Sequence, residues 1–169
     1  MPLTDVVRTY LQMTEPAQLR PARVDDRRVR VERVGTCPPS FYRYLYGAVG
    51  ERWHWRDRRR WSDEEIRAWF ADPGVSLHVM YVEGAPAGYA ELKRHPDGST
   101  ELAYFGLLPE FIGRGLGKHL LTTAVERAWA EGAARVWLHT CTLDSPRALP
   151  NYLARGFTPF REERYGVEL

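Results

Sequence analysis

A glycine-rich stretch in the second half of the chain could bind an anion through its backbone. Residues 112–118 read Ile-Gly-Arg-Gly-Leu-Gly-Lys, and an apolar helical stripe follows them. Glycine lets the backbone approach a ligand closely, and the first turn of a helix carries unpaired N–H groups and the positive end of the helix dipole. Arg114 and Lys118 add positive charge. This combination is typical of phosphate binding.

The spacing of the glycines differs from that of two well-known phosphate loops. The pattern is G-x-G-x-G, whereas dinucleotide folds carry G-x-G-x-x-G. His119 follows Lys118, where a P-loop has Ser or Thr. The stretch therefore indicates an anion site without naming the ligand, and a tight strand-to-helix turn with no ligand is the alternative.

The elements that must position this stretch alternate between strands and helices. Period-2 patterns and turn signals predict six strands, at residues Arg23–Val34, Val75–Val82, Pro86–Lys93, Thr100–Leu107, Arg135–Cys141 and Phe157–Arg164. Helices are expected at residues 41–49, after the Ser62/Glu65 capping box, at residues 116–129 and from Asp144. Thr4–Gln12 is expected to form a short helix or a loose arm, within a loosely packed segment of residues 1–20.

This order predicts an α/β protein with a mixed sheet and helices on both faces. Residues 75–107 read as an antiparallel meander, and a strand–helix–strand unit follows at residues 100–141. The length of 169 residues fits one domain. We therefore expect residues 1–169 to form a single domain.

Composition narrows the class of protein. Hydrophobic residues make up 44% and charged residues 27% of the chain, which is typical of a globular domain. No apolar run reaches the roughly 18 residues that span a bilayer, no secretion signal is recognisable, and two cysteines do not form a disulfide framework. We expect a cytoplasmic protein without membrane contact.

The charge balance does not require a polyanionic partner. The net charge is 24 − 22 = +2, and all but two of the 24 basic residues are arginine. Arginine enrichment suits phosphate or nucleic-acid contact, and a GC-rich genome is the alternative explanation. Nucleic-acid binding through the segments Arg20–Arg33 and Arg52–Arg60 is a further alternative, although no reader motif accompanies them.

Three segments, in this order, resemble the GCN5-related N-acetyltransferases, the GNAT superfamily. Leu107-Leu-Pro109 is similar to the family's V-x-P, and Ile112–Gly117 resembles its phosphate loop, R/Q-x-x-G-x-G/A. Residues 145–157 resemble its N-x-x-A-x-x-x-Y-x-x-x-G-F segment. The chain departs from these patterns at Ile112, Ser145 and Pro150, and the tail after Phe157 leaves little room for a seventh strand.

The resemblance implies the GNAT fold: a mostly antiparallel central sheet that splays between its fourth and fifth strands, here Thr100–Leu107 and Arg135–Cys141. Acetyl-CoA would lie in that notch as acyl donor, with no metal. Its pyrophosphate would lie on the backbone of Gly113–Lys118. Its pantetheine would pair near Leu107, and its acetyl carbonyl would accept from an N–H near Phe105. The implied cofactor-binding residues are Phe105, Leu107, Ile112, Gly113, Arg114, Gly115, Leu116, Gly117 and Lys118.

The resemblance also implies acetyl transfer to an amine by direct attack. An alkylamine is mostly ammonium at neutral pH, so a base must remove a proton. Glu101 lies where lysine-acetylating relatives carry a catalytic glutamate, and His139 and Glu91 are the second and third candidates. Tyr152 matches the tyrosine that protonates the departing thiolate. Each has a packing role as its alternative, and Cys141 is expected to be a packed thiol rather than a nucleophile.

The resemblance implies that the first two helices and their loop shape the acceptor site, here with Trp53, Trp55 and Glu91. Tryptophans packed inward beneath surface arginines are the alternative. The net charge of residues 51–60 is 5 − 2 = +3, which favours an amine that also carries a carboxylate or phosphate over a strongly cationic acceptor. The acceptor would be a small-molecule or protein amine, and the enzyme could form a homodimer, as is common in this family. A catalytically inactive acyl-CoA-binding regulatory module is the alternative function.

Overall fold

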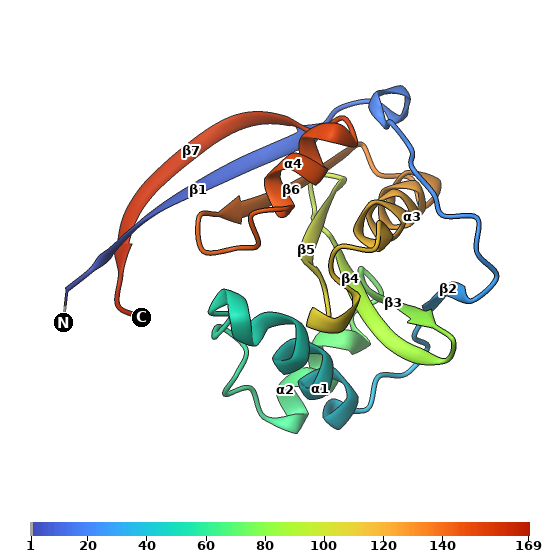
Figure 1. Cartoon of the computed structure of the whole chain (residues 1–169), viewed down its shortest axis with the longest axis horizontal. Coiled ribbons are helices and arrows are strands. Elements are labelled where there is room, and N and C mark those ends of the chain that lie inside the picture. The colour runs from blue at the N-terminus through green and yellow to red at the C-terminus, as the bar shows by residue number, and fades with distance from the viewer. Residues whose placement is uncertain (1) are drawn as a thin grey trace.

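The computed structural model describes residues 2–169 and builds them around one seven-stranded sheet (Figure 1). The sheet order is β2-β3-β4-β5-β6-β1-β7, and β5 and β6 are the parallel pair in an otherwise antiparallel sheet. The strands are β1 Thr4–Met13, β2 Val29–Arg33, β3 Val75–Val82, β4 Ala85–Arg94, β5 Ser99–Leu107, β6 Arg135–Cys141 and β7 Thr158–Val167. The predicted mixed sheet and its meander are confirmed.

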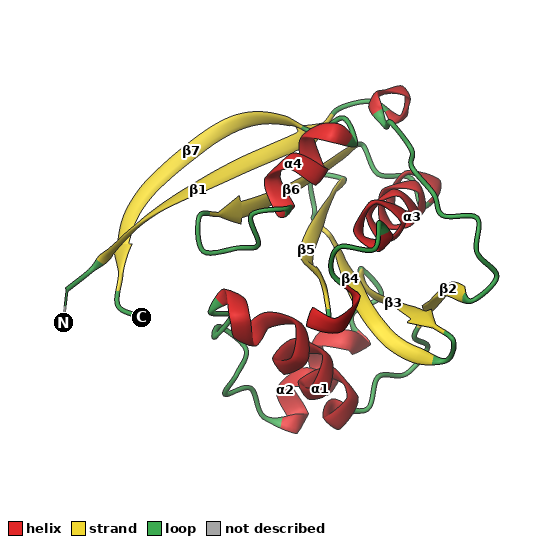
Figure 2. Cartoon of the chain, viewed as in Figure 1, coloured by secondary structure: helices red, strands yellow, loops and turns green. Residues whose placement is uncertain are grey.

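Helices cover both faces of the sheet, as predicted (Figure 2). The helices are α1 Pro39–Gly50, α2 Asp63–Ala71, α3 Leu116–Ala130 and α4 Ala148–Ala154, with short 3₁₀ turns η1 Pro16–Gln18, η2 Glu51–Trp53 and η3 Pro109–Phe111. On one face α1 and α2 pack over Leu77 and Val79 of β3. On the other face α3 packs over Ala90 and Leu92 of β4, and Tyr152 of α4 belongs to the same cluster. Each strand of the meander therefore contributes to two separate hydrophobic clusters.

Local sequence signals set the helix ends. The predicted capping box starts α2: the Glu65 N–H donates to Ser62 Oγ (3.1 Å), and the Ser62 N–H donates to Glu65 Oε1 (3.2 Å). Gly115 precedes α3 with a φ of 74°, and Gly132 follows it with a φ of 92°, both in the left-handed region that glycine adopts without strain.

The sheet divides at β5 and β6. These strands pair only from Ser99–Glu101 on β5 to Arg135–Trp137 on β6. Beyond Glu101, β5 remains paired with β4, and β6 remains paired with β1. The two halves of the sheet therefore diverge between β5 and β6, where the predicted notch was expected.

The N-terminal residues form a strand and not the predicted helix or loose arm. β1 lies between β6 and β7, with Arg8 opposite Cys141 on one side and Glu163 on the other. Leu11 and Met13 are fully buried in the core. Polar residues such as Arg8 and Gln12 interrupt the apolar positions, so the segment shows no clean period of two, and pairing with two neighbours decides its conformation. The sheet therefore has seven strands instead of the six predicted, and the additional strand comes from the N-terminal segment, not from the residues after Phe157.

Two predicted elements begin later than expected. The strand expected over Arg23–Val34 reaches only from Val29 to Arg33. Before it, the Ala22 N–H donates to Thr122 Oγ1 and the Val24 N–H donates to His119 Nδ1, so this stretch bonds to α3 instead of to a strand. The helix expected from Asp144 starts at Ala148, because the Asp144 carboxylate accepts from Thr140 and closes a turn.

The burial of β1 gives a stability prediction. Leu11→Ala should lower the free energy of unfolding by about 2–5 kcal/mol, because it leaves a cavity in the core. Leu3→Ala, 63% exposed in the same segment, should change it by less than about 0.5 kcal/mol. Urea denaturation measures both values. Equal, small effects would mean that the N-terminal segment packs loosely after all.

Candidate active site

A cavity of about 600 Å³ opens where β5 and β6 diverge. Its walls come from β5, β6, the start of α3, the turn after β6, α4 and the loop between α1 and α2, with Arg8 of β1, Trp69 of α2, and Tyr165 and Val167 of β7. Figure 1 shows that these segments, distant in sequence, converge beside the open ends of β5 and β6. The cavity is therefore the place where the predicted site residues can meet.

The glycine-rich stretch forms one end of the cavity. Gly113 and Gly115 have φ values of 84° and 74°, which turn the chain sharply from η3 into α3. No side chain in the described structure caps the first turn of α3, so its N–H groups are available to an anion. The predicted donor-site residues that line the cavity are Phe105, Leu107, Ile112, Gly113, Gly115, Leu116, Gly117 and Lys118.

Arg114 is not among the residues that line the cavity. Its guanidinium lies 5.3 Å from the centre of the Phe111 ring. Sequence reasoning missed Arg147, which lines the cavity instead. An Arg147 guanidinium nitrogen lies 3.5 Å from the point where a Cβ on Gly113 would stand. Its contact with the glycine turn depends on how α4 docks, which local sequence does not reveal.

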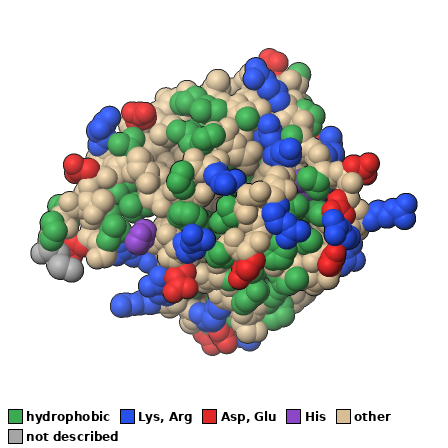
Figure 3. Space-filling model, viewed as in Figure 1, with side chains coloured by type: hydrophobic (Ala, Val, Ile, Leu, Met, Phe, Trp, Pro, Cys, Tyr) green, Lys and Arg blue, Asp and Glu red, His purple; other side chains and the backbone are tan. Residues whose placement is uncertain are grey.

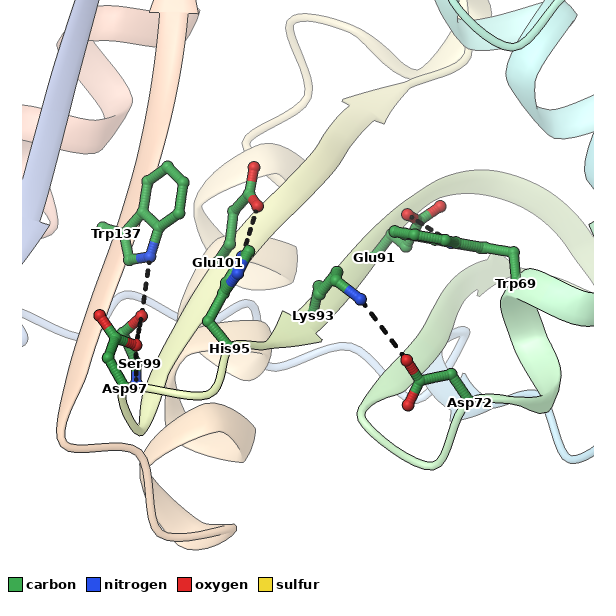
Figure 4. Close-up of polar contacts among 9 residues, drawn as sticks. All are labelled: Trp69, Asp72, Glu91, Lys93, His95, Asp97, Ser99, Glu101 and Trp137. Atoms are coloured by element: carbon green, nitrogen blue, oxygen red, sulfur yellow. Dashed lines mark hydrogen bonds and ion pairs between the residues drawn. The ribbon is translucent and has the colours of Figure 1, made fainter.

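Glu101 lies at the wall of the cavity, where the pairing of β5 with β6 ends. Its Oε1 is 2.8 Å from His95 Nε2, and its side chain is 15% exposed against 29% for His95. Behind them, the Trp137 ring lies tilted against the His95 ring, with ring centres 5.4 Å apart, and donates through Nε1 to Ser99 Oγ (Figure 4). One carboxylate oxygen of Glu101 is thereby held in place at the cavity wall.

The other two candidate catalytic side chains line the same cavity. His139 is open to the cavity but surrounded by protein, and this loss of water, together with the charge of Arg8, lowers its pKa below the usual 6.5. Burial raises the pKa of Tyr152, so its phenol keeps its proton. Cys141 also lines the cavity, and burial raises the pKa of its thiol. An imidazole base, a phenol acid and a protonated thiol therefore coexist here.

Both predicted tryptophans border the cavity. Trp55 packs edge to face against Tyr104, with ring centres 4.9 Å apart. A Cβ on Gly50 would collide with the Trp55 ring, so glycine is needed at that position. Trp55 is thus packed inward against the sheet while it borders the cavity, and the role of this aromatic wall, Trp53 and Trp55, toward an acceptor stays a prediction.

Glu91 does not reach the cavity. It is fully buried and accepts hydrogen bonds from Arg58 (2.6 Å), from the Tyr42 hydroxyl (2.8 Å) and from Trp69 Nε1 (3.1 Å), the last drawn in Figure 4. Burial alone would lower the pKa of Arg58, but Glu91, Tyr42 and Tyr104 together more than offset this, and the pKa is raised. The charged guanidinium then lies 4.4 Å from the centre of the Tyr104 ring. Glu91 thus anchors the aromatic wall and has no direct contact with an acceptor.

A comparison with family models matches residues 43–157, more than half of the chain, to the acetyltransferase (GNAT) family. The chain belongs to this GNAT family. The match includes β5, the glycine turn, α3, β6 and α4, and so contains most of the cavity wall. Membership agrees with the resemblance of the three sequence segments and with the divergence of β5 and β6.

Two curated relatives are mycothiol acetyltransferases. The one from Saccharopolyspora erythraea is 30% identical over 116 residues, which is 66% of this chain and 37% of the relative. The one from Corynebacterium efficiens is 28% identical over 117 residues, again 66% of this chain and 38% of the relative. The chain thus spans less than two fifths of the length of these relatives.

A solved structure shares the GNAT fold. It is a GCN5-related N-acetyltransferase from Kribbella flavida, with a TM-score of 0.69 and 21% identity. The similarity covers 97% of this chain and 59% of that chain. The likeness includes almost the whole chain, so it extends beyond the residues that the family model matches.

Three further features of the described residues concern surface charge, metal ligands and helix length. On the face seen in Figure 3, Lys and Arg side chains are interspersed with acidic and apolar ones and do not gather into one basic band. Within residues 2–169, no cluster of three or more His, Cys, Asp or Glu side chains could hold a metal ion. Over the same residues, no helix has the length and apolarity to cross a membrane.

The buried ion pair behind the aromatic wall gives a second stability prediction. Arg58→Met should lower the free energy of unfolding by about 3–5 kcal/mol, because it leaves the Glu91 carboxylate buried without its cation. Arg60→Met, at an exposed position in the same loop, should change it by less than about 0.5 kcal/mol. Chemical denaturation compares the two variants. A stable Arg58→Met protein would contradict the anchoring role of Glu91.

Proposed function

We propose that this protein transfers an acetyl group from acetyl-CoA to a primary amine by direct attack within a ternary complex. The observation that carries the proposal is the cavity between β5 and β6, which combines an uncapped glycine turn with Glu101, His139 and Tyr152. Family membership supports the same chemistry. The described residues thus offer an anion site and proton-transfer groups within one enclosure.

The glycine turn is the proposed site of the pyrophosphate. Its free N–H groups and the positive end of the α3 dipole favour a negative group, and Lys118 and Arg147 add charge at the rim. Beyond Glu101, the edge of β5 that faces β6 is no longer paired, so its backbone groups can bond to the pantetheine amides. The proposed contacts are at Leu107, and at Phe105 for the acetyl carbonyl.

The proposed reaction balances its protons within the cavity. The base takes a proton from the ammonium group, and the free amine attacks the acetyl carbon. The C–S bond breaks, the CoA sulfur takes a proton from the Tyr152 phenol, and the attacking nitrogen gives its second proton to the resulting phenolate, which restores the phenol. Glu101 is the proposed base, since its carboxylate is held in place by His95, and His139 is the second candidate.

No acyl-enzyme is proposed. Cys141 is the thiol in the cavity, but its raised pKa keeps it protonated, and a thiol is a much weaker nucleophile than a thiolate. The mycothiol acetyltransferases suggest a small-molecule acceptor, and a protein amine is the other candidate. A homodimer and a cytoplasmic location remain predictions from the sequence and the family.

The donor site can be tested at Gly117. A Cβ there would meet Asn151 and Leu107 only at ordinary contact distances, 3.6 and 3.7 Å, so substitution should leave the fold intact. Gly117→Glu should weaken acetyl-CoA binding at least about tenfold, because it places a negative charge where the pyrophosphate would lie. Gly117→Ala is the uncharged control and should bind within a few-fold of the wild type. Calorimetric titration measures both, and equal affinities would place the phosphates elsewhere.

The assignment of the base can be tested by two variants. Glu101→Gln should lower kcat/KM by about 10²–10⁴-fold while acetyl-CoA affinity stays unchanged. His139→Asn should retain activity within about tenfold.

The effect of His139→Asn on the pH profile of kcat/KM separates the two candidate bases. If His139 were the base, the acid limb would have its midpoint below pH 6.5, because the pKa of this imidazole is lowered, and activity would fall as the ring gains its proton. His139→Asn would then remove that limb and most of the rate, which would contradict the assignment to Glu101. Binding of acetyl-CoA without turnover with any amine would favour the inactive regulatory module.

A further inference from the structure

β1 brings a cation into the cavity that neither the donor site nor the proposed proton transfers use. Arg8 lines the cavity together with Tyr165 of β7, and its side chain is 33% exposed. In the sheet it lies opposite Cys141 on one side and Glu163 on the other. The position of Arg8 at the cavity thus depends on the pairing of β1 within this sheet.

The hydrogen-bonding groups of Arg8 are only partly satisfied. Its Nη2 donates to the Tyr165 hydroxyl at 3.3 Å, and the guanidinium lies 5.0 Å from the centre of that ring. Its Nη1 is 3.6 Å from Glu163 Oε2, which is an ion pair but too long for a good hydrogen bond. Its Nε is buried and has no partner among the described residues. The Nη1 group, in a side chain that is 33% exposed, therefore keeps donors that an anion in the cavity could use.

Glu163 does not fully neutralise Arg8, because its carboxylate is shared. Arg161 donates to Glu163 Oε1 at 2.5 Å, and the Tyr10 hydroxyl donates to Oε2 at 3.3 Å. The two arginines of the nearby loop that also line the cavity have partners of their own. Arg56 donates to the Glu168 carbonyl at 2.6 Å, and Arg58 is paired with Glu91. Positive charge at this wall is therefore concentrated on Arg8.

Arg8 and Glu101 lie toward opposite ends of one stretch of β6. Glu101 is opposite Trp137, and Arg8 is opposite Cys141, four residues farther along the strand. Four residues of strand span about 13 Å, and alternate residues share a face, so both side chains reach toward the same side of β6 around His139. The remaining gap, once both side chains extend into it, suits a small molecule with charges at its two ends.

We propose that the acceptor is a small primary amine that also carries an anionic group, a carboxylate or a phosphate. Arg8 binds the anion while the amine faces Glu101, and the aromatic wall at Trp53 and Trp55 encloses the part between them. Guanidinium groups recognise both anions through two parallel N–H donors. The inference rests on the proposed acetyl transfer and adds the class of acceptor to it.

Matched pairs of amines test this directly. With acetyl-CoA as donor, thiol release is measured for phenylalanine against phenethylamine, and for phosphoethanolamine against ethanolamine. At least one acidic member should exceed its neutral partner about tenfold or more in kcat/KM, and which pair does so distinguishes carboxylate from phosphate. Equal rates within both pairs, or a preference for the neutral amines, would overturn the anion site.

Variants of two arginines supply the control. Arg8→Gln should abolish the preference for the acidic amine, mainly by raising its KM, and Arg8→Lys should retain part of it. Arg161 also pairs with Glu163 but does not line the cavity. The Arg161→Gln variant should therefore prefer acidic amines as strongly as the wild type does. An unchanged preference in folded Arg8→Gln protein, judged by its thermal melting, would contradict the inference.

Binding separates failure of the acceptor class from failure of the enzyme. Calorimetric titration of the wild type and Arg8→Gln with the same amines requires no turnover. Binding of acidic amines that depends on Arg8, without thiol release from any amine, would overturn acetyl transfer and keep the anion site. Turnover with no preference for acidic amines would keep acetyl transfer and overturn the anion site. If neither binding of acidic amines nor thiol release occurred, acetyl transfer and the anion site would both be overturned.

Discussion

The pairing of β5 with β6 ends at Glu101 and Trp137, and the cavity depends on that divergence. Parallel strands that stayed paired would fill the space with ladder hydrogen bonds. Because they part, β5 keeps unpaired backbone groups beyond Glu101, and the glycine turn is aimed at the opening. The same break thus supplies the space, the donors for a pantetheine chain and the position of a carboxylate.

Two supports hold the walls of this opening apart. β1 lies between β6 and β7 and joins that half of the sheet to the core through Leu11 and Met13. On the other side, the buried pair of Arg58 and Glu91 holds the loop between α1 and α2 against the aromatic residues of the meander. One wall is therefore held mainly by apolar burial and the other by a buried ion pair, so they should respond differently to substitution.

Sequence reasoning predicted the parts that depend on local patterns. The strands β3 and β6 were placed at their observed bounds, and the Ser62 capping box and the glycine turn were read from short-range signals. β1 was missed, since its conformation depends on two strands more than 120 residues away in the chain. Glu91 was predicted to be a base or an acceptor contact, but Arg58, from the loop between α1 and α2, pairs with it inside the core. Arg8 and Arg147 were missed for the same reason: long-range pairing and docking bring them to the site.

The most direct test of this account is a calorimetric titration of the purified chain with acetyl-CoA. The cavity between β5 and β6 should give one binding site per chain with a dissociation constant in the micromolar range, and the ligand should raise the melting temperature. Absence of both heat and thermal shift would contradict the account, because the glycine turn and the unpaired edge of β5 would then be features of the fold without a donor to hold.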